Sequence, residues 1–321
     1  MTVKIVVSDI PAFEDRHYDL LRREVPTVTV ATPSNEDLAM ELADAEVFFG
    51  YHEPQVFREA TKLKWIQTSS AGLDAILIPE VVERNLLVSN ASGVHAAAVV
   101  EQAWALTTAI SRDMSTYFRQ QIEHVWEWGR LYDLDGATAG IIGLGGIGRR
   151  YAKIAEAFGM RVIAVDAHQP GQPEWVSELW SIDRLDDLLA ESDVVLVACP
   201  YTAETHHLIN ADRLAAMKAD AILINIARGS IVDELALAKT LQEGHLMGAG
   251  IDVCEAEPLP AESPLWDVPR LIITPHVAGH TSKRKQRLME FFIKNLRRYL
   301  RGEAVENLVD QRKGYPIPTA N

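Results

Sequence analysis

The chain has 321 residues, more than one ordinary hydrophobic core holds, which predicts two domains of common size. Hydrophobic residues make up 48% and charged residues 24%, a balance typical of a globular protein and not of a disordered or fibrous one. The formal net charge of -14 argues against a protein that grips a long stretch of nucleic-acid duplex.

The cellular location is predicted from features that the sequence lacks. No uncharged apolar stretch reaches the roughly 18 residues of a membrane-spanning helix, and Asp9 interrupts the first apolar run before a signal-peptide core could form. The two cysteines, Cys199 and Cys254, have no metal-binding spacing and are expected to be reduced thiols. We therefore expect a cytoplasmic protein without a membrane partner.

The first part of the chain alternates short β-branched runs with helical patterns, which is typical of βαβ units and a parallel sheet. A helix is predicted over 17–23, and strands are predicted at 3–8, 27–30, 46–51, 63–68 and 86–90. These elements predict one small doubly wound domain.

A long helix is expected from His95 to about Gln120, and it is apolar on much of its circumference. Such a helix is buried between domains or subunits. An aromatic, loop-like stretch, HVWEWGRLYDLDG, follows it at 124–136.

The second domain begins with the stretch TAGIIGLGGIGRR at 138–150, where an apolar strand runs into Gly143, Gly145 and Gly148 and then into a helix. A strand at 161–165 follows, and Asp166 stands at its end, about 20 residues on, as a dinucleotide site requires. The glycines permit a tight turn and close approach to a pyrophosphate, whose charge the helix N-terminus favours. Asp166 can accept hydrogen bonds from the adenosine ribose.

Four further strands are predicted, at 194–197, 221–226, 246–251 and 271–274, which gives this domain six. In the dinucleotide-binding arrangement, strands numbered along the chain lie in the order 3-2-1-4-5-6, with ligands outside their carboxyl ends. The glycine loop follows the first strand, Arg228 the fourth, Asp252 and Glu257 the fifth, and His276 the sixth. Because these strands are consecutive neighbours in that order, we expect their polar side chains to gather where the nicotinamide would lie.

Five motifs together resemble the D-isomer-specific 2-hydroxyacid dehydrogenases. They are the glycine loop, CPYTAETHHLI (199–209), NIARGSIVDE (225–234), DVCEAEPLP (252–260) and TPHVAGHT (274–281), in the family's order. The likeness extends to SSAGLD (69–74) and ENLVD (306–310). The resemblance implies an NAD-dependent D-2-hydroxyacid dehydrogenase, or 2-oxoacid reductase, that transfers hydride between nicotinamide C4 and substrate C2.

The resemblance also implies a domain arrangement of the α/β class, with two doubly wound parallel-sheet domains. A Rossmann dinucleotide-binding domain, residues 99–281, would be inserted into a flavodoxin-like substrate domain formed by residues 1–98 and 282–321. It further implies a homodimer built largely on the long helix and the aromatic stretch.

Carried over residue by residue, the resemblance implies three catalytic residues. Arg228 would hold the substrate carboxylate and polarise the keto oxygen, His276 would be the general acid/base, and Glu257 would orient His276. A guanidinium fork matches a 2-oxo acid geometrically and keeps its proton. Histidine can donate a proton to the carbonyl oxygen as hydride arrives, and can take it back in the reverse reaction.

The remaining site residues are expected to bind substrate or cofactor. The backbone N–H groups of Ser70, Ala71 and Gly72 would anchor the substrate carboxylate as a small anion nest, and Tyr51 is expected to face the substrate. Asp252 would meet the nicotinamide, and Cys199 would line the adenosine side. The full set expected to contact NAD is Gly143, Gly145, Gly146, Ile147, Gly148, Asp166, Cys199, Pro200, Ile226, Ala227, Arg228, Asp252, His276, Ala278 and Gly279.

The sequence also allows two other interpretations. Formate dehydrogenases share the fold but carry glutamine where this chain has Glu257. A corepressor-like, non-catalytic family member would keep the dinucleotide site and dock peptides, and steady turnover of any 2-oxo acid would exclude it. The sequence leaves the substrate side chain open, and the pair His206-His207 lacks a third ligand for a metal.

Overall fold

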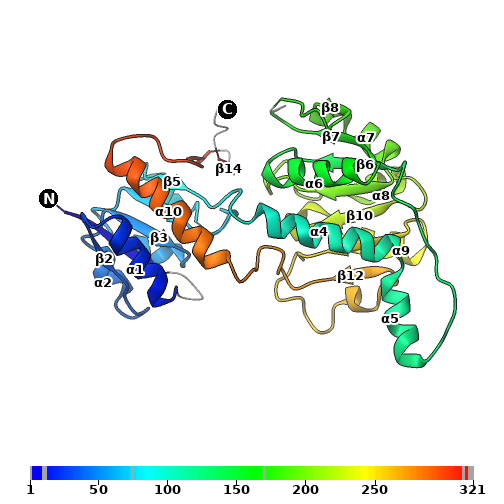
Figure 1. The fold of residues 1–321 in the computed structure, drawn as a ribbon, viewed down its shortest axis with the longest axis horizontal. Coiled ribbons are helices and arrows are strands. Elements are labelled where there is room, and N and C mark those ends of the chain that lie inside the picture. Colours follow the sequence, from blue (N-terminus) through cyan, green and yellow to red (C-terminus); the bar gives the residue numbers. More distant parts are fainter. Residues whose placement is uncertain (1, 9–12, 74–75, 169–170, 313–314, 317–321) are drawn as a thin grey trace. The chain divides into compact units, whose positions relative to one another are not determined.

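The computed structural model describes residues 2–8, 13–73, 76–168, 171–312 and 315–316 (Figure 1). The chain divides into two compact units, each considered by itself. Unit 1 comprises Met1–His95 and Thr281–Asn321, and unit 2 comprises Ala96–His280.

Unit 1 contains a parallel sheet with the strand order β2-β1-β3-β4-β5. Its strands are β1 (Val3–Ser8), β2 (Val28–Ala31), β3 (Val47–Gly50), β4 (Trp65–Thr68) and β5 (Leu87–Ser89). All five predicted strands are present, with ends that differ from the prediction by at most two residues. The order is that of flavodoxin-like doubly wound sheets, as predicted.

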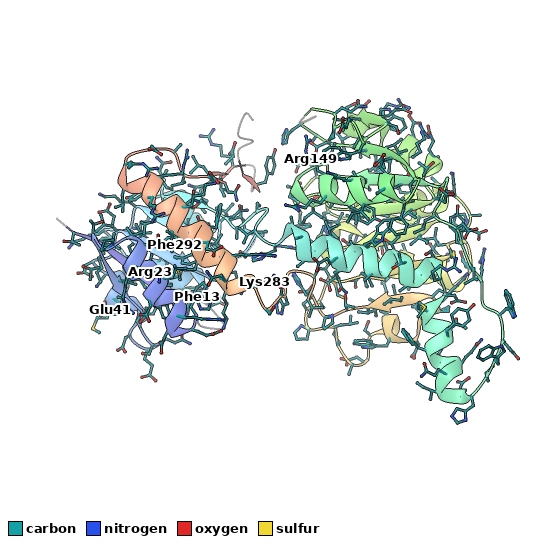
Figure 2. The ribbon with its side chains drawn as sticks, in the orientation of Figure 1. Phe13, Arg23, Glu41, Arg149, Lys283 and Phe292 are labelled. Atoms are coloured by element: carbon teal, nitrogen blue, oxygen red, sulfur yellow. The ribbon has the colours of Figure 1, made fainter. Side chains whose placement is uncertain are left out.

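The C-terminal part of the chain completes the core of unit 1. Helix α10 (Arg284–Leu300) packs against α1 (Asp15–Glu24) on one face of the sheet (Figure 2). There the ring of Phe292 stacks on Phe49 with centroids 4.1 Å apart, and Phe13 lies 5.3 Å from Phe49. The other face is covered by short helices: α2 (Leu38–Leu42), η1 (Pro54–Phe57) and α3 (Pro79–Val82). A two-stranded ribbon, β13 (Val309–Asp310) with β14 (Tyr315–Pro316), follows α10.

Unit 2 contains a seven-stranded sheet with the order β12-β11-β10-β9-β6-β7-β8, in which every described pairing is parallel. The strands are β6 (Thr138–Ile142), β7 (Arg161–Val165), β8 (Glu178–Trp180), β9 (Val194–Val197), β10 (Ile222–Asn225), β11 (Gly248–Ile251) and β12 (Leu271–Ile273). The two sheets confirm the predicted α/β class with two doubly wound domains.

The prediction of six strands for unit 2 is wrong by one. The additional strand is β8, a three-residue edge strand that pairs with β7. As a result β9, predicted as the third strand, in fact pairs with β6, and β10 pairs with β9 instead of β6. The polar residues of interest still follow β10, β11 and β12, which continue in this order on the same side of β6.

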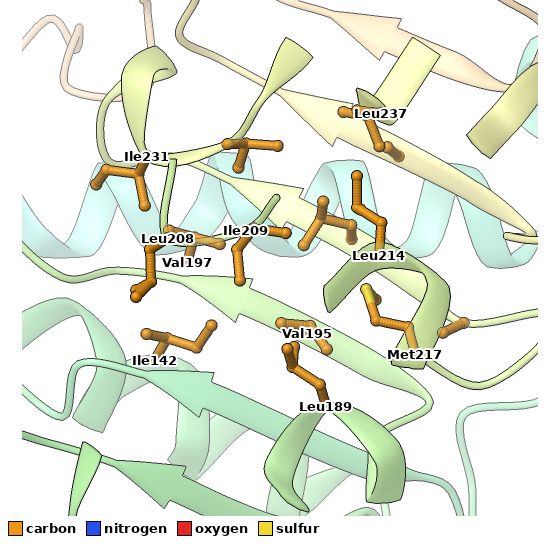
Figure 3. Close-up of a cluster of buried hydrophobic side chains, with 14 of the residues drawn as sticks. Ile142, Leu189, Val195, Val197, Leu208, Ile209, Leu214, Met217, Ile231 and Leu237 are labelled. Atoms are coloured by element: carbon orange, nitrogen blue, oxygen red, sulfur yellow. The ribbon is translucent and has the colours of Figure 1, made fainter. Parts of the chain in front are cut away.

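Helices cover both faces of this sheet. On one face lie α4 (Ala96–Ser111) and α6 (Gly146–Ala157), and on the other lie α7 (Leu185–Glu191), α8 (Ala211–Ala216) and α9 (Glu234–Gln242). Figure 3 shows the second of these cores, where Leu189, Leu214 and Met217 from the helical layer meet Val195 and Val197 of β9. Short 3-10 turns are η2 (Ile182–Arg184), η3 (Gly229–Ile231) and η4 (Pro264–Asp267).

The long helix expected from His95 to about Gln120 is broken, so this prediction is wrong in part. Helix α4 ends at Ser111 and α5 spans Met114–Glu123, because Asp113 adopts a left-handed backbone with φ 49°. Its carboxylate accepts a hydrogen bond from the N–H of Arg130 at 3.0 Å, which ties the aromatic stretch to the break. None of the helices in the described part of the chain combines the length and apolar character that a bilayer crossing requires.

Candidate functional site

The glycine loop after β6 has the shape that its sequence predicts. Gly143 has φ +96°, and a Cβ there would lie 2.8 Å from the backbone nitrogen of Cys199. A Cβ on Gly148 would lie 2.1 Å from the carbonyl oxygen of Gly143, so only glycine lets α6 approach the loop this closely. These two glycines therefore hold the start of α6 against the strand ends.

The second glycine has open space in front of it. Gly145 is the N-cap residue of the 12-residue helix α6, and a Cβ there would meet nothing within 4 Å. The first N–H groups of a helix lack internal partners and, with the helix dipole, favour an anion. The loop therefore fits the pyrophosphate of a dinucleotide, with Gly146 and Ile147 in the first helical turn.

Asp166 lies at the end of β7, next to the glycine loop. One carboxylate oxygen accepts a hydrogen bond from the N–H of Leu144 at 2.8 Å, and the other accepts from the N–H of His168 at 2.8 Å. Each carboxylate oxygen can accept a second hydrogen bond. The half-buried carboxylate is thus fixed in orientation and still fits the hydroxyl groups of a ribose.

Arg149, the residue after the last glycine of the loop, was not among the residues predicted from the sequence. Its Nε donates to the carbonyl of Leu144 at 3.1 Å, and its Nη2 donates to the carbonyl of Gly171 at 2.9 Å. Arg149 thus joins the glycine loop to the segment after β7. Its position in the quoted stretch GLGGIGRR was the available signal.

Arg228 follows β10 and is half-buried. The Asn225 side chain bridges this turn: its Nδ2 donates to the carbonyl of Arg228 at 2.9 Å, and its Oδ1 accepts from the N–H of Ala227 at 3.1 Å. A Cβ on Gly229 would lie 2.0 Å from the carbonyl carbon of Cys254, so the loops after β10 and β11 are in backbone contact. The turn that carries Arg228 therefore rests on the loop that carries Glu257.

His276 and Glu257 form the predicted pair. The distance from His276 Nδ1 to Glu257 Oε2 is 2.6 Å, and the other oxygen of Glu257 accepts from the N–H of Cys254 at 3.0 Å. Both side chains stay open to solvent, with exposed fractions of 48% for His276 and 38% for Glu257. A histidine held at one nitrogen and exposed at the other can exchange a proton with a ligand.

Asp252 has a role that the sequence analysis did not foresee. It is 1% exposed, and its carboxylate accepts from the hydroxyl of Thr274 and from the N–H groups of Val277 at 3.0 Å and Ala278 at 2.8 Å. Its own carbonyl accepts from the N–H of His276 at 2.7 Å. Asp252 therefore shapes the turn that presents His276, while its contact with the nicotinamide stays a prediction.

The other residues predicted to bind the cofactor lie along the same carboxyl edge of the sheet. Cys199 and Pro200 follow β9, Ile226 and Ala227 follow β10, and Ala278 and Gly279 lie in the turn after β12. Burial raises the pKa of the Cys199 thiol to about 12, so that it is neutral where a cofactor would pass. The structure therefore brings all predicted cofactor residues of unit 2 to one edge.

In unit 1, one of the three N–H groups of the predicted anion nest has a partner within its own turn. The N–H of Ser70 donates to Thr68 Oγ1 at 3.1 Å, whereas the N–H groups of Ala71 and Gly72 meet no acceptor among the described residues. The turn is held by Asn90, whose Nδ2 donates to the carbonyl of Ala71 at 2.6 Å. Two of the three predicted N–H groups therefore remain for an anion, and Tyr51 is exposed at the end of β3.

The chain is similar to proteins of known class. Residues 104–278 match the family model described as "D-isomer specific 2-hydroxyacid dehydrogenase, NAD binding domain". A glyoxylate reductase of Pyrococcus horikoshii is 39% identical over 269 residues, which cover 81% of this chain and 80% of that protein.

Two solved structures show the same fold over nearly the whole chain. One is a D-isomer specific 2-hydroxyacid dehydrogenase from Xanthobacter autotrophicus in complex with NADPH and MES (TM-score 0.87, 28% identity, 98% of this chain and 100% of that one). The other is a D-lactate dehydrogenase from Aquifex aeolicus complexed with NAD and lactic acid (TM-score 0.77, 27% identity, 99% and 100%).

These findings define the class of the protein. The chain belongs to the D-isomer specific 2-hydroxyacid dehydrogenase family. It is an NAD(P)-dependent oxidoreductase that acts on CH–OH groups, and the resemblance stated from the sequence is confirmed.

Proposed function

We propose that this chain is an NAD(H)-dependent reductase of small 2-oxo acids, with glyoxylate as the first candidate substrate. The observation that carries the proposal is the pair of His276 Nδ1 and Glu257 Oε2, 2.6 Å apart. The pair lies at the same sheet edge as the glycine loop, and its loop is in backbone contact with the turn of Arg228. The glyoxylate reductases among the relatives support the choice of the first substrate.

In this proposal, each side chain has a defined role. Arg228 binds the substrate carboxylate through charge-assisted hydrogen bonds and polarises the neighbouring carbonyl. His276 Nε2 donates a proton to the carbonyl oxygen, because Glu257 holds Nδ1. Bound NADH supplies the hydride that reduces C2 of the substrate. In the oxidation direction, neutral His276 takes the hydroxyl proton back.

We propose NAD rather than NADP as the preferred cofactor, on the basis of Asp166. Its ionised carboxylate, fixed by two backbone N–H groups, would lie close to a 2'-phosphate and repel it. The relative that was solved with NADPH shows that the family includes proteins that bind the other cofactor. The preference is tested by comparing kcat/KM for NADH with kcat/KM for NADPH.

We also propose that the protein is a homodimer. None of the side chains of helix α5 is fully buried, and the segment after it exposes Trp126 at 98% and Trp128 at 91%. With Phe118 and Ile122, also exposed, they form an apolar surface of the kind that marks a protein interface. Sedimentation at twice the 35.6 kDa chain mass supports the dimer, and a monomer at micromolar concentration contradicts it.

The function is tested by initial rates with a panel of 2-oxo acids: glyoxylate, hydroxypyruvate, pyruvate and phenylpyruvate, each with NADH and NADPH. The proposal expects steady turnover of at least one small oxo acid and a higher kcat/KM with NADH. Cofactor binding without turnover of any oxo acid contradicts it and favours a non-catalytic member of the family.

A further inference from the structure

The loop that carries Glu257 is held by a residue of helix α9. Glu234 is the first residue of this helix, directly after its N-cap residue Asp233, and its Oε1 accepts a hydrogen bond from the N–H of Glu255 at 2.6 Å. Two residues further along that loop, the side chain of Glu257 contacts His276 Nδ1. One short segment of backbone thus joins the anchor of the loop to Glu257, the partner of the proposed acid/base His276.

The segment has little freedom on its other side. The backbone at Cys254 and Glu255 lies against Gly229, where a Cβ would come within 2.3 Å of the Glu255 nitrogen. The N–H of Cys254 donates to Glu257 at 3.0 Å. The backbone of the segment contacts Gly229 and is hydrogen-bonded to Glu234. These two contacts restrict the orientation in which the segment presents Glu257.

The charges around Glu234 are predominantly negative. The groups that face it are Glu255, Glu257 and His207, and the Nε2 atom of His207 lies 3.0 Å from Glu255 Oε1. Burial is the largest effect that raises the pKa of the Glu234 carboxyl, and the charges of Glu255 and Glu257 raise it further. The hydrogen bond from the Glu255 N–H opposes this increase. Glu234 is thus a half-buried carboxylate that adds to the negative charge of Glu255 and Glu257 at this loop.

We propose that Glu234 is a positioning residue for the acid/base: it fixes the loop that presents Glu257, and its charge adds to that of Glu257 in favouring protonated His276. This inference rests on the proposed function, because it assigns Glu234 to the proton donor of that reaction. It has two separable parts, the hydrogen bond to Glu255 and the negative charge.

Three variants separate these parts. Glu234→Gln keeps an oxygen acceptor for the Glu255 N–H and removes the charge, whereas Glu234→Leu removes both. The matched control is Glu243→Gln, because Glu243 is an exposed glutamate at the opposite end of the same helix and its replacement changes the charge equally. If Glu234→Leu fails to fold, Glu234→Gln alone carries the test.

The first readout is the pH profile of kcat/KM in the direction of oxo-acid reduction. For Glu234→Gln, the limb on which the rate falls with rising pH should move about half a pH unit lower, since a neighbouring charge across partly solvated protein changes proton affinity by about that much. The low-pH plateau should stay within twofold of wild type. For Glu234→Leu, the plateau should fall about tenfold, because the loop loses its anchor. Glu243→Gln should match wild type.

The second readout needs neither turnover nor cofactor. The chain has ten histidines, and with ¹³Cε1-labelled histidine the His276 resonance is identified as the one missing from His276→Ala. The pH at the midpoint of its titration should be lower in Glu234→Gln than in wild type, again by about half a pH unit. The inference would be overturned if Glu234→Gln changed neither the titration midpoint of His276 nor the pH profile of kcat/KM. A shifted midpoint with no wild-type turnover of any oxo acid would overturn the proposed function alone, and the coupling between Glu234 and His276 would stand.

Discussion

His276 Nδ1 and Glu257 Oε2 lie 2.6 Å apart although 19 positions separate the two residues along the chain. Three backbone features make this meeting possible: the left-handed φ of 52° at His276, the turn that Asp252 holds, and the hydrogen bond from the Cys254 N–H to Glu257. The carboxylate holds Nδ1 of the imidazole, so Nε2 is the nitrogen that would meet a ligand. The first predictions follow from this pair.

Replacing Glu257 by Gln should change the pH profile of kcat/KM for oxo-acid reduction. The limb on which the rate falls with rising pH should move to lower pH. Glutamine can still hydrogen-bond to His276 Nδ1, but it lacks the charge that favours the imidazolium, so the proton needed for reduction is lost at lower pH. We expect a displacement of about one pH unit, the effect of one adjacent opposite charge. The check is a pair of kcat/KM profiles in both directions. An unmoved reduction limb would show that the contact does not affect proton donation.

Replacing Arg228 by Lys should weaken both substrate affinity and turnover. A fork that makes two charge-assisted hydrogen bonds becomes a single movable donor, and one such bond contributes roughly 1.5 to 3 kcal/mol, or about one to two decades in kcat/KM. Steady-state kinetics with the best oxo acid measures this loss. Activity within twofold of wild type would assign Arg228 to the support of the loop instead.

Replacing Asp166 by Ser should reduce the preference for NADH over NADPH. The variant removes the negative charge that opposes a 2'-phosphate and leaves a hydroxyl that still bonds the ribose. The ratio of kcat/KM for NADH to that for NADPH should fall by about tenfold, the effect of 1.4 kcal/mol at the cofactor site. If wild type already prefers NADPH, the proposed role of Asp166 is wrong.

His17 should make the stability of the protein depend on pH. It is fully buried in α1, and its Nδ1 accepts from the N–H of Glu14 at 3.2 Å. Burial, and then the charge of Arg16, lower the pKa of His17 below its usual 6.5. Since the unfolded chain takes up a proton near 6.5 and the folded chain only at lower pH, stability is full above 6.5 and falls as pH drops toward the folded value.

The variant His17→Asn isolates this effect, because asparagine Oδ1 can replace Nδ1 as the acceptor and does not titrate in this range. The thermal midpoint should fall less between pH 7.5 and pH 5.5 in His17→Asn than in wild type. Equal decreases in the two proteins would mean that His17 does not contribute to acid sensitivity.

Much of the site was predictable because strand ends and glycine spacing are local features of the sequence. The glycine loop, Asp166, Arg228 and His276 each follow directly on an apolar strand, and the structure has them at one sheet edge. Their roles in binding and catalysis remain proposals that the experiments above address.

What could not be predicted depends on contacts between distant segments. The break at Asp113 is accompanied by a hydrogen bond from the Arg130 N–H, 17 positions away. The part that Asp252 plays appears only when its carboxylate meets the N–H groups of Val277 and Ala278. Strand β8, Glu178–Trp180, is too short for a two-residue alternation to be visible and forms because β7 offers it a free edge.

The variant His276→Ala, measured for both oxo-acid reduction and NADH binding, tests most directly whether His276 is the acid/base. The cofactor is expected to be held mainly by the glycine loop and Asp166, so the Kd for NADH should change less than about threefold. Loss of the proton donor should lower kcat for reduction by about 10² to 10⁴-fold. A His276→Ala enzyme that keeps its turnover within a few-fold of wild type would contradict the central claim that His276 is the acid/base.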